Sequence, residues 1–348
     1  MDILYVIKPN KNHSKILHKM IFSSVKGINY KIIDNIDPNL NLKNKKIIFA
    51  MELSEIGYDI DMINTMNKLY NIGNNTLENS TAMVLCHSCN ELSTKRATQD
   101  LIFIANSLGC SFIGHPLVEA TVSLNNFLTW QKTINLPLEE LCLKMCSRTA
   151  NRLMDYNYIP IKNPKILVLY SSPHSRSNTL DLWHMVSKNL DNYFIKELQI
   201  ENGEIMDCKG CPYNLCIHYG KQNSCFYGGI MVKEVLPSIE YCDVIIWLCP
   251  NYNDSIAANL TALINRLTVL YRKTSFYNKT IFSLIVSGNS GSDSVAKQLI
   301  GALNINKGFR LPPYFSLTAT ANDPKSIYKI KRIEKIAEDF SKNMIKSI

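Results

Sequence analysis

Residues 165–170 read Lys-Ile-Leu-Val-Leu-Tyr, and residues 171–179 continue as Ser-Ser-Pro-His-Ser-Arg-Ser-Asn-Thr. The first stretch is continuously apolar after its lysine, which is typical of a strand buried on both faces in a parallel sheet. The second is a polar loop, and after it Leu182, Met185 and Val186 recur at helical spacing. A buried strand, a polar loop and an amphipathic helix form the repeating unit of an α/β sheet.

The same unit recurs along the second half of the chain. Further strands are predicted at residues 193–200, 243–249 and 280–286. The strand at 243–249 is almost entirely apolar, so we expect it at the centre of the sheet. The last helix, with Ile333 and Phe340 on its apolar face, is expected to close the domain.

The first half of the chain resembles a degenerate copy of the second. Three pairs of segments are similar: 2–9 with 165–172, 46–51 with 244–247, and 81–88 with 280–287. The sequence therefore predicts two α/β domains, although all open α/β domains share this rhythm and the likeness could be coincidence. The predicted boundaries are 1–150 for the first domain, 151–164 for a proline-containing linker, and 165–348 for the second domain.

The composition excludes several classes of protein. Of 348 residues, 46% are hydrophobic and 19% are charged, which rules out a disordered chain, a collagen and a coiled coil. No apolar run is long enough to span a membrane, and no secretory signal is visible, so we expect a cytoplasmic protein without a membrane partner. The net charge is 38 − 29 = +9, but the lysines are spread out and form no basic–aromatic module, so no nucleic-acid partner is expected. An odd number of cysteines, eleven, argues against a disulfide framework.

Three polar loops are predicted at one edge of the second sheet. The loop at 171–179 combines hydroxyls, an amide and an arginine before a helix, where backbone N–H groups favour a phosphate. A plain helix cap is the alternative explanation for this loop. Residues 249–255 place a tyrosine and two amides after the central strand, and residues 287–292 supply glycines that permit close approach. Together the three loops favour a planar ligand that carries a phosphate.

These motifs resemble a known group, the flavodoxin-like NAD(P)H-dependent FMN reductases and the related iron–sulfur flavoproteins. The resemblance covers residues 165–348. It rests on the phosphate-loop pattern, on Pro250-Asn251-Tyr252 with the helix 260–266 after it, and on Cys208-Lys209-Gly210-Cys211. The chain departs from the family pattern at Ser171, His174 and residues 228–231, where the family has glycine, arginine and Asp-Asp-Met; Arg176 could replace the missing arginine.

Together with the likeness between the two halves of the chain, the resemblance implies two flavodoxin-like, doubly wound parallel-sheet domains in tandem, of which the N-terminal one is degenerate. Its loop at 8–15 lacks the hydroxyl cluster, so this domain would serve dimerisation or shape the active site. The C-terminal domain would be an NAD(P)H-dependent oxidoreductase that binds FMN and uses NAD(P)H as cosubstrate. The expected partners are a small-molecule acceptor, such as a quinone or a free flavin, or an electron carrier, and a second copy of the chain. No catalytic acid or base is required, because the cofactor carries the difficult chemistry.

The resemblance also implies the cofactor-binding residues. The phosphate side is expected at Ser171, Ser172, Pro173, His174, Arg176, Ser177, Asn178 and Thr179. The ring is expected to be bordered by Pro250, Asn251, Tyr252 and Asn253 on one edge and by Ser287, Gly288 and Asn289 on the other.

The cysteines leave alternatives open. Cys208, Cys211, Cys216 and Cys225 supply four thiolates, enough for an iron–sulfur cluster or for zinc, but plain reductases of the family keep cysteines here without a metal. Cys86 and Cys89 form a Cys-x-x-Cys pair that is redox-active or merely packed. Cys142 and Cys146 are predicted to be packing residues.

Two other functions therefore remain beside the plain reductase. One is an iron–sulfur flavoprotein for electron transfer. The other is a non-catalytic binding or scaffold protein whose flavin site has decayed, an alternative motivated by Ser171 and His174.

Overall fold

The computed structural model describes residues 3–10, 13–171 and 177–348. The chain divides into two compact units, Met1–Tyr158 and Ile159–Ile348. The division falls within the segment 151–164 that we predict to be a linker, and residues 151–155 of that segment continue a helix of the first unit.

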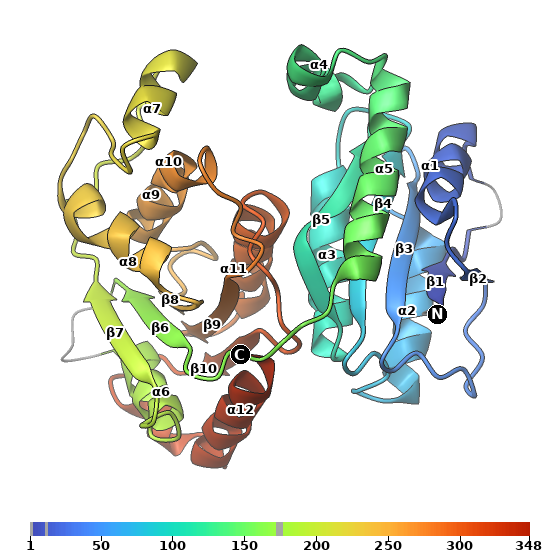
Figure 1. Cartoon of the computed structure of the whole chain (residues 1–348). Coiled ribbons are helices and arrows are strands. Elements are labelled where there is room, and N and C mark those ends of the chain that lie inside the picture. The colour runs from blue at the N-terminus through green and yellow to red at the C-terminus, as the bar shows by residue number, and fades with distance from the viewer. Residues whose placement is uncertain (1–2, 11–12, 172–176) are drawn as a thin grey trace. The chain divides into compact units, whose positions relative to one another are not determined.

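The N-terminal unit is a parallel sheet of five strands covered by helices on both faces (Figure 1). Its strands are β1 (Leu4–Ile7), β2 (Tyr30–Ile33), β3 (Lys46–Leu53), β4 (Thr81–Ser88) and β5 (Ser111–Ala120). Its helices are α1 (Lys15–Val25), α2 (Ile60–Ile72), α3 (Thr94–Ser107), the short 3₁₀ turn η1 (Asn125–Phe127), α4 (Leu128–Ile134) and α5 (Leu138–Asp155). The strand order is β2-β1-β3-β4-β5.

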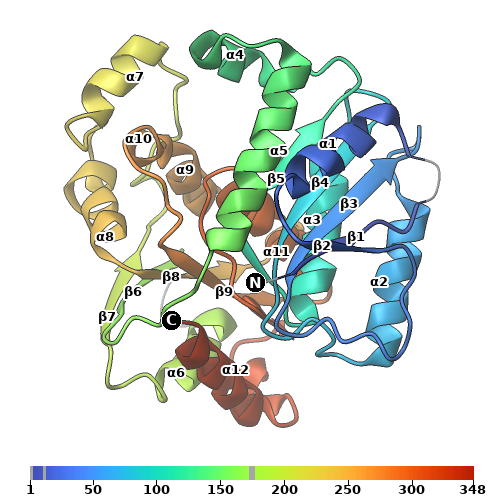
Figure 2. The same cartoon turned by 45° about the vertical axis from the view of Figure 1, so that its right-hand side comes forward.

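One face of this sheet packs against α1 and α5, which lie side by side in Figures 1 and 2. Leu17 of α1 and Leu141 of α5 are both fully buried in this core. Cys142 and Cys146 of α5 are buried in the same core, which confirms that they are packing residues.

The C-terminal unit repeats this plan. Its strands are β6 (Lys165–Tyr170), β7 (Phe194–Gln199), β8 (Val244–Pro250), β9 (Thr280–Ser287) and β10 (Ser316–Thr320). Its helices are α6 (Asn178–Ser187), α7 (Tyr213–Gly220), η2 (Met231–Val235), α8 (Leu236–Tyr241), α9 (Ala258–Arg266), α10 (Thr268–Tyr271), α11 (Ser292–Leu299), η3 (Ile300–Ile305), η4 (Ser326–Lys329) and α12 (Ile333–Ser347). The strand order is β10-β9-β8-β6-β7, and every pairing in it is parallel.

Counted from its own first strand, each sheet has the order 2-1-3-4-5, which is the flavodoxin-like arrangement. The predicted fold, two tandem flavodoxin-like α/β units, is therefore confirmed. The four strands predicted in the second half correspond to β6, β7, β8 and β9.

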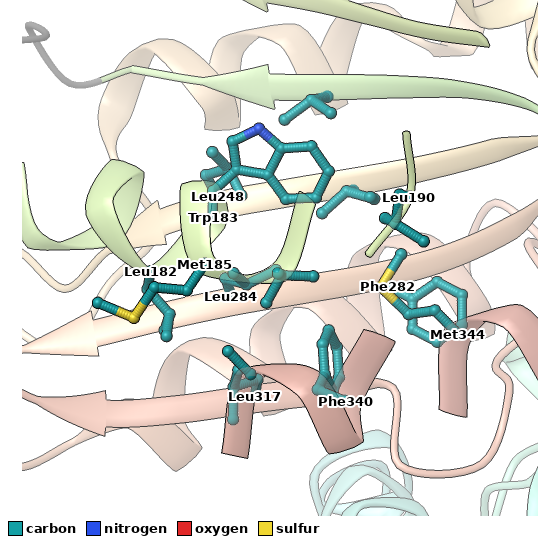
Figure 3. Packing of buried hydrophobic residues seen from close by; sticks show 14 of the residues in the cluster. Leu182, Trp183, Met185, Leu190, Leu248, Phe282, Leu284, Leu317, Phe340 and Met344 are labelled. Carbon is teal, nitrogen blue, oxygen red and sulfur yellow. The ribbon is translucent and has the colours of Figure 1, made fainter. Parts of the chain in front are cut away.

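The core of the C-terminal unit lies between the sheet and the helices α6 and α12 (Figure 3). Trp183 of α6 is fully buried, and its indole N–H donates to Glu197 of the edge strand β7 at 2.6 Å. Phe282 of β9 meets Phe340 of α12 edge to face, with ring centroids 5.9 Å apart. This packing fixes α6, and with it the N-terminus of that helix, against the sheet.

In the part of the chain that the structure describes, no helix has the length and apolar content needed to cross a membrane.

Candidate functional site at the carboxyl edge of the C-terminal sheet

The candidate site begins where β6 passes into α6. The strand order reverses between β6 and β8, and ligands of open α/β sheets bind beyond the carboxyl ends of the strands at such a switch point. Ser177 caps α6 by accepting a hydrogen bond from the Leu180 N–H at 3.2 Å. The predicted phosphate-side residues Ser172, Pro173, His174 and Arg176 lie outside the described residues.

Ser171 and Asn178, on either side of residues 172–176, differ in their hydrogen bonding. The hydroxyl oxygen of Ser171 is buried and has no hydrogen-bond partner among the described residues. Asn178, by contrast, is 7% exposed, and its amide donates to the carbonyls of Ala321 and Asp323 at 3.1 and 2.8 Å. The Asn178 side chain therefore ties α6 to the segment after β10, which leaves only its backbone to face an anion. Thr179 is also buried.

The loop after β8 is a tight hairpin. Tyr252 and Ser255 form an antiparallel bridge, and the two residues between them, Asn253 and Asp254, have φ of +53° and +56°. Two successive positive φ values define the turn that matches the twist of a short hairpin, and Asn and Asp tolerate them better than most residues. The turn presents Tyr252, which is 54% exposed.

Asn251 connects this hairpin to the loop after β9. Its side-chain amide donates to the Ser287 hydroxyl at 3.0 Å and to the Ser290 carbonyl at 2.8 Å. It also donates to Asp254 Oδ1 at 3.2 Å. The amide oxygen Oδ1 of Asn251 is buried and has no partner among the described residues. An unpaired buried acceptor beside two converging loops suits a donor supplied by a ligand.

Glycines allow these two loops to approach each other closely. Gly291 has φ +83°, and a Cβ there would lie 1.8 Å from Asp254 Oδ1. At Gly288 a Cβ would lie 2.9 Å from Oδ1 of Asn322, so this second glycine brings the loop after β9 close to the segment after β10. The structure thus brings the loops after β8 and β9 together as predicted. It also adds Asp254 and Gly291, which the sequence analysis did not single out as site residues.

The four clustered cysteines lie elsewhere, around one cavity of about 40 Å³. Cys208 is exposed, and Cys211, Cys216 and Cys225 are partly buried. Within the described ranges, no three His, Cys, Asp or Glu side chains are placed to hold one metal ion. The predicted metal site therefore stays a prediction.

The carboxyl edge of the N-terminal sheet contains a polar cluster that sequence reasoning missed. Glu52, at the end of β3, accepts hydrogen bonds from the N–H and the hydroxyl of Ser14, both at 2.9 Å, and Ser14 is the N-cap of α1. The other carboxylate oxygen of Glu52 pairs with Nδ1 of His87, at the end of β4. Burial would raise the pKa of Glu52, but its hydrogen bonds to His87 and Ser14 outweigh this and lower the pKa.

The Cys-x-x-Cys pair at this edge is divided between two environments. Cys86 is fully buried, whereas Cys89 is exposed. Burial raises the pKa of the Cys86 thiol, which disfavours thiolate chemistry there.

Comparison with known proteins points to one family. Residues 164–322 match the family model described as NADPH-dependent FMN reductase. The resemblance predicted for the C-terminal half is therefore confirmed, and the family it resembles consists of NAD(P)H-dependent flavin enzymes, as predicted. No curated protein is similar enough to match.

Similar solved structures cover about half of the chain. An NAD(P)H:quinone oxidoreductase from Methanothermobacter marburgensis is 11% identical, with 52% of this chain and 99% of that chain covered and a TM-score of 0.40. An azoreductase from Bacillus anthracis is 15% identical, with 53% and 99% covered and a TM-score of 0.41. Flavodoxin 2 from Bacillus cereus is 11% identical, with 52% and 98% covered and a TM-score of 0.34.

Proposed function

We propose that the C-terminal unit is an NAD(P)H-dependent oxidoreductase that binds FMN at the carboxyl edge of its sheet. The observation that carries this proposal is the pair of buried oxygens, Ser171 Oγ and Asn251 Oδ1, without partners among the described residues. Buried polar atoms are rarely unpaired unless water or a ligand completes them. These two atoms lie at the ends of β6 and β8, on either side of the switch point. The family match over residues 164–322 supports a flavin as the ligand.

Different residues of this edge would bind different parts of the FMN molecule. The N-terminus of α6, with Ser171 and Ser177 beside it, would hold the phosphate through backbone N–H groups and hydroxyls. Asn251 Oδ1 would accept a hydrogen bond from the ring system, while the exposed Tyr252 would cover its edge. The loop that starts at Ser287 would border the opposite side, where Gly288 lets the backbone lie close to the side chain of Asn322.

The chemistry that bound FMN supplies is acceptance of a hydride from NAD(P)H and release of electrons to an acceptor. The protein's own contribution is binding, orientation and control of access, so no side-chain acid or base is needed. The acceptor would be a quinone, a free flavin or an electron carrier, and the chain would act as a homodimer.

A titration of the full-length, flavin-free protein with FMN tests this proposal, with riboflavin as the matched ligand that lacks the phosphate. We expect FMN to bind and riboflavin to bind at least about tenfold more weakly, because charge-assisted hydrogen bonds to the phosphate are lost. The FMN-loaded protein should then oxidise NADH or NADPH when a quinone is supplied. A protein that takes up no FMN would contradict the proposal and support the scaffold alternative.

Elemental analysis of the same preparation decides the iron–sulfur alternative. Iron in stoichiometric amount, with cluster absorption in the visible spectrum, would make this protein an iron–sulfur flavoprotein. Protein that is yellow and free of iron would support the plain reductase.

A further inference from the structure

The cysteine cavity is a feature that the flavin proposal does not use. It lies between the segment that contains α7 and the end of α9 with α10. Helices α7 and α10 lie beside each other in Figures 1 and 2. Their contact is close at Gly220, where a Cβ would lie 3.2 Å from the carbonyl oxygen of Val269.

All four thiols of the segment 208–225 line this one cavity. Cys208 is the exposed member, and it reaches solvent at the rim. Its backbone N–H donates to Asp207 Oδ1 at 2.7 Å, and the same oxygen accepts from the Asn265 amide of α9 at 2.8 Å. These bonds anchor Cys208 to a helix. Cys211 lines the same cavity and is partly buried.

The backbone between Cys208 and Cys211 contains one glycine in the left-handed region. Gly210 has φ +66°, and a Cβ at this position would meet nothing within 4 Å. A glycine with open space around it lets the backbone adjust, so that two cysteines separated by two residues can come within bonding distance. A disulfide requires its Cα atoms to lie roughly 4.4–6.8 Å apart.

The surroundings of the cavity are cationic. Arg266 is only 3% exposed; one guanidinium N–H donates to the Gly228 carbonyl at 3.0 Å, while its Nε has no hydrogen-bond partner in the part of the chain that the structure describes. Lys307 is 7% exposed and donates to Thr268, whose side chain also lines the cavity. Among the described residues, neither cation forms an ion pair. The wall of the cavity that the four cysteines line therefore includes a buried guanidinium.

From this arrangement we infer that Cys208 and Cys211 are a reversible dithiol–disulfide pair that exchanges with small-molecule disulfides. A cavity of about 40 Å³ has room for few atoms, and a disulfide adds none. The exposed Cys208 is the attacking residue and the partly buried Cys211 the resolving one.

The exchange has two steps. The sulfur of Cys208 attacks one sulfur of a disulfide R–S–S–R and forms a mixed disulfide with it. The S–S bond of R–S–S–R breaks, and one R–SH leaves with the proton that Cys208 gives up. Cys211 then attacks the sulfur of Cys208 in the mixed disulfide, and the second R–SH leaves with the proton from Cys211. The protein loses two electrons and two protons, and the small disulfide gains both. An external dithiol reverses the reaction.

Equilibration with glutathione tests this inference and does not depend on flavin binding. Reduced full-length protein is incubated without oxygen at graded ratios of oxidised to reduced glutathione, quenched with an alkylating agent, and analysed by peptide mass spectrometry. We expect a peptide that links Cys208 to Cys211, with a mass lower by two hydrogens, and its disappearance after treatment with dithiothreitol.

Three single variants assign the roles. Cys211→Ser should trap glutathione on Cys208, and Cys208→Ser should slow the exchange by at least about tenfold. Cys216→Ser is the matched control in the same cavity and should keep the 208–211 link. The mapping of the wild-type protein decides the matter even if a variant fails to fold.

Absence of the link at every ratio would overturn the inference, and so would a link between other cysteines. Stoichiometric iron or zinc that protects these thiols from alkylation would overturn it too, because the sulfurs would then be metal ligands. None of these outcomes bears on whether FMN binds at the other site.

Discussion

The two sheets of this protein share one topology, but their carboxyl edges are built from different chemistry. In the N-terminal sheet, Lys46 pairs with Thr81 and, six residues on, Glu52 pairs with His87. In the C-terminal sheet, Val244 pairs with Thr280 and, six residues on, Pro250 pairs with Val286. A hydrogen-bonded glutamate and histidine thus stand in the first unit where two apolar residues stand in the second.

This difference explains why a side chain of the protein itself occupies the carboxyl edge of the N-terminal sheet, which we call the closed edge. The carboxyl edge of the C-terminal sheet, which we call the open edge, is the candidate site. Glu52 places its carboxylate on the N–H and hydroxyl of Ser14, at the N-terminus of α1. In the C-terminal unit the corresponding helix N-terminus, at Ser177, is where we propose that a phosphate binds. The N-terminal unit therefore supplies its own anion, whereas the C-terminal edge keeps two buried oxygens without partners among the described residues.

The largest effect is expected from Gly291→Ala. The new methyl group would fall on Asp254 Oδ1 in a left-handed backbone position, and displacing Asp254 would break its bond to Asn251. We expect a loss of about 1–3 kcal/mol in the free energy of unfolding, and FMN affinity weakened by more than tenfold, roughly the effect of 1.4 kcal/mol. Chemical denaturation and FMN titration measure both.

Gly27→Ala is the matched control for that variant. Gly27 has φ +78° after the end of α1, but a Cβ there would meet nothing within 4 Å. The substitution should lower the free energy of unfolding only by the backbone strain, about 1 kcal/mol, and leave FMN affinity unchanged. Equal losses of stability and affinity in the two variants would show that close approach at Gly291 is unimportant.

The closed edge is tested by Glu52→Gln. The lowered pKa of Glu52 means that its ionised form stabilises the folded chain above pH 4.5, its ordinary value, and that this stabilisation is lost as the pH falls through the lower folded-state pKa. At pH 7 the variant should be less stable by about 1–3 kcal/mol. The difference from the wild type should shrink below pH 4.5. Hydrogen exchange in α1, β3 and β4, measured at both pH values, would locate the effect; a difference independent of pH would contradict the role of the charge.

The open edge is tested by Asn251→Leu, since Leu53 follows Glu52 in the N-terminal sheet as Asn251 follows Pro250. Leucine removes the bonds to Ser287 and Ser290 and the proposed acceptor for the ring. We expect FMN affinity to fall about tenfold and stability to fall by about 1 kcal/mol. Asn343→Leu is the control, because Asn343 donates to the Pro313 carbonyl at 2.9 Å, away from the edge. If both variants bind FMN alike, the proposed role of Asn251 is wrong.

The sequence was sufficient to predict the central strands, because their apolar runs have no other place in an α/β domain. It did not reveal the edge strands β2, β5 and β10. Tyr30 and Ile32 of β2 are exposed, and β10 reads Ser-Leu-Thr-Ala-Thr, so neither of these two shows the pattern of a buried strand.

The sequence predicted which loops form the candidate site, because the topology places them at one edge of the sheet. It did not predict the contacts that their side chains make. The pairing of Glu52 with His87 joins residues 35 apart, and nothing local marks it. Asn178 has the composition of a phosphate ligand, yet its amide reaches carbonyls more than 140 residues away. Such contacts follow from tertiary packing, which spacing alone does not determine.

The smallest effects are expected from substitutions of two tyrosines, Tyr58 in the loop after β3 and Tyr252 in the loop after β8. The ring of Tyr58 is covered by the guanidinium of Arg96, whose Cζ lies 4.3 Å from the ring centroid. Tyr252 is 54% exposed, and its ring is free to lie against a planar ligand. Tyr252→Leu should weaken FMN binding by about three- to tenfold, which corresponds to the 0.5–1.5 kcal/mol of an aromatic pair. Its melting temperature should not change, because the side chain packs little in the free protein. Tyr58→Leu should do the opposite, leaving FMN affinity intact while costing about 0.5–1 kcal/mol of stability through the lost cation–π contact. The two variants are compared by FMN titration and thermal unfolding side by side. If Tyr58→Leu weakened FMN binding as much as Tyr252→Leu, the flavin would not be confined to the C-terminal edge, and the contrast between a closed and an open edge would fail.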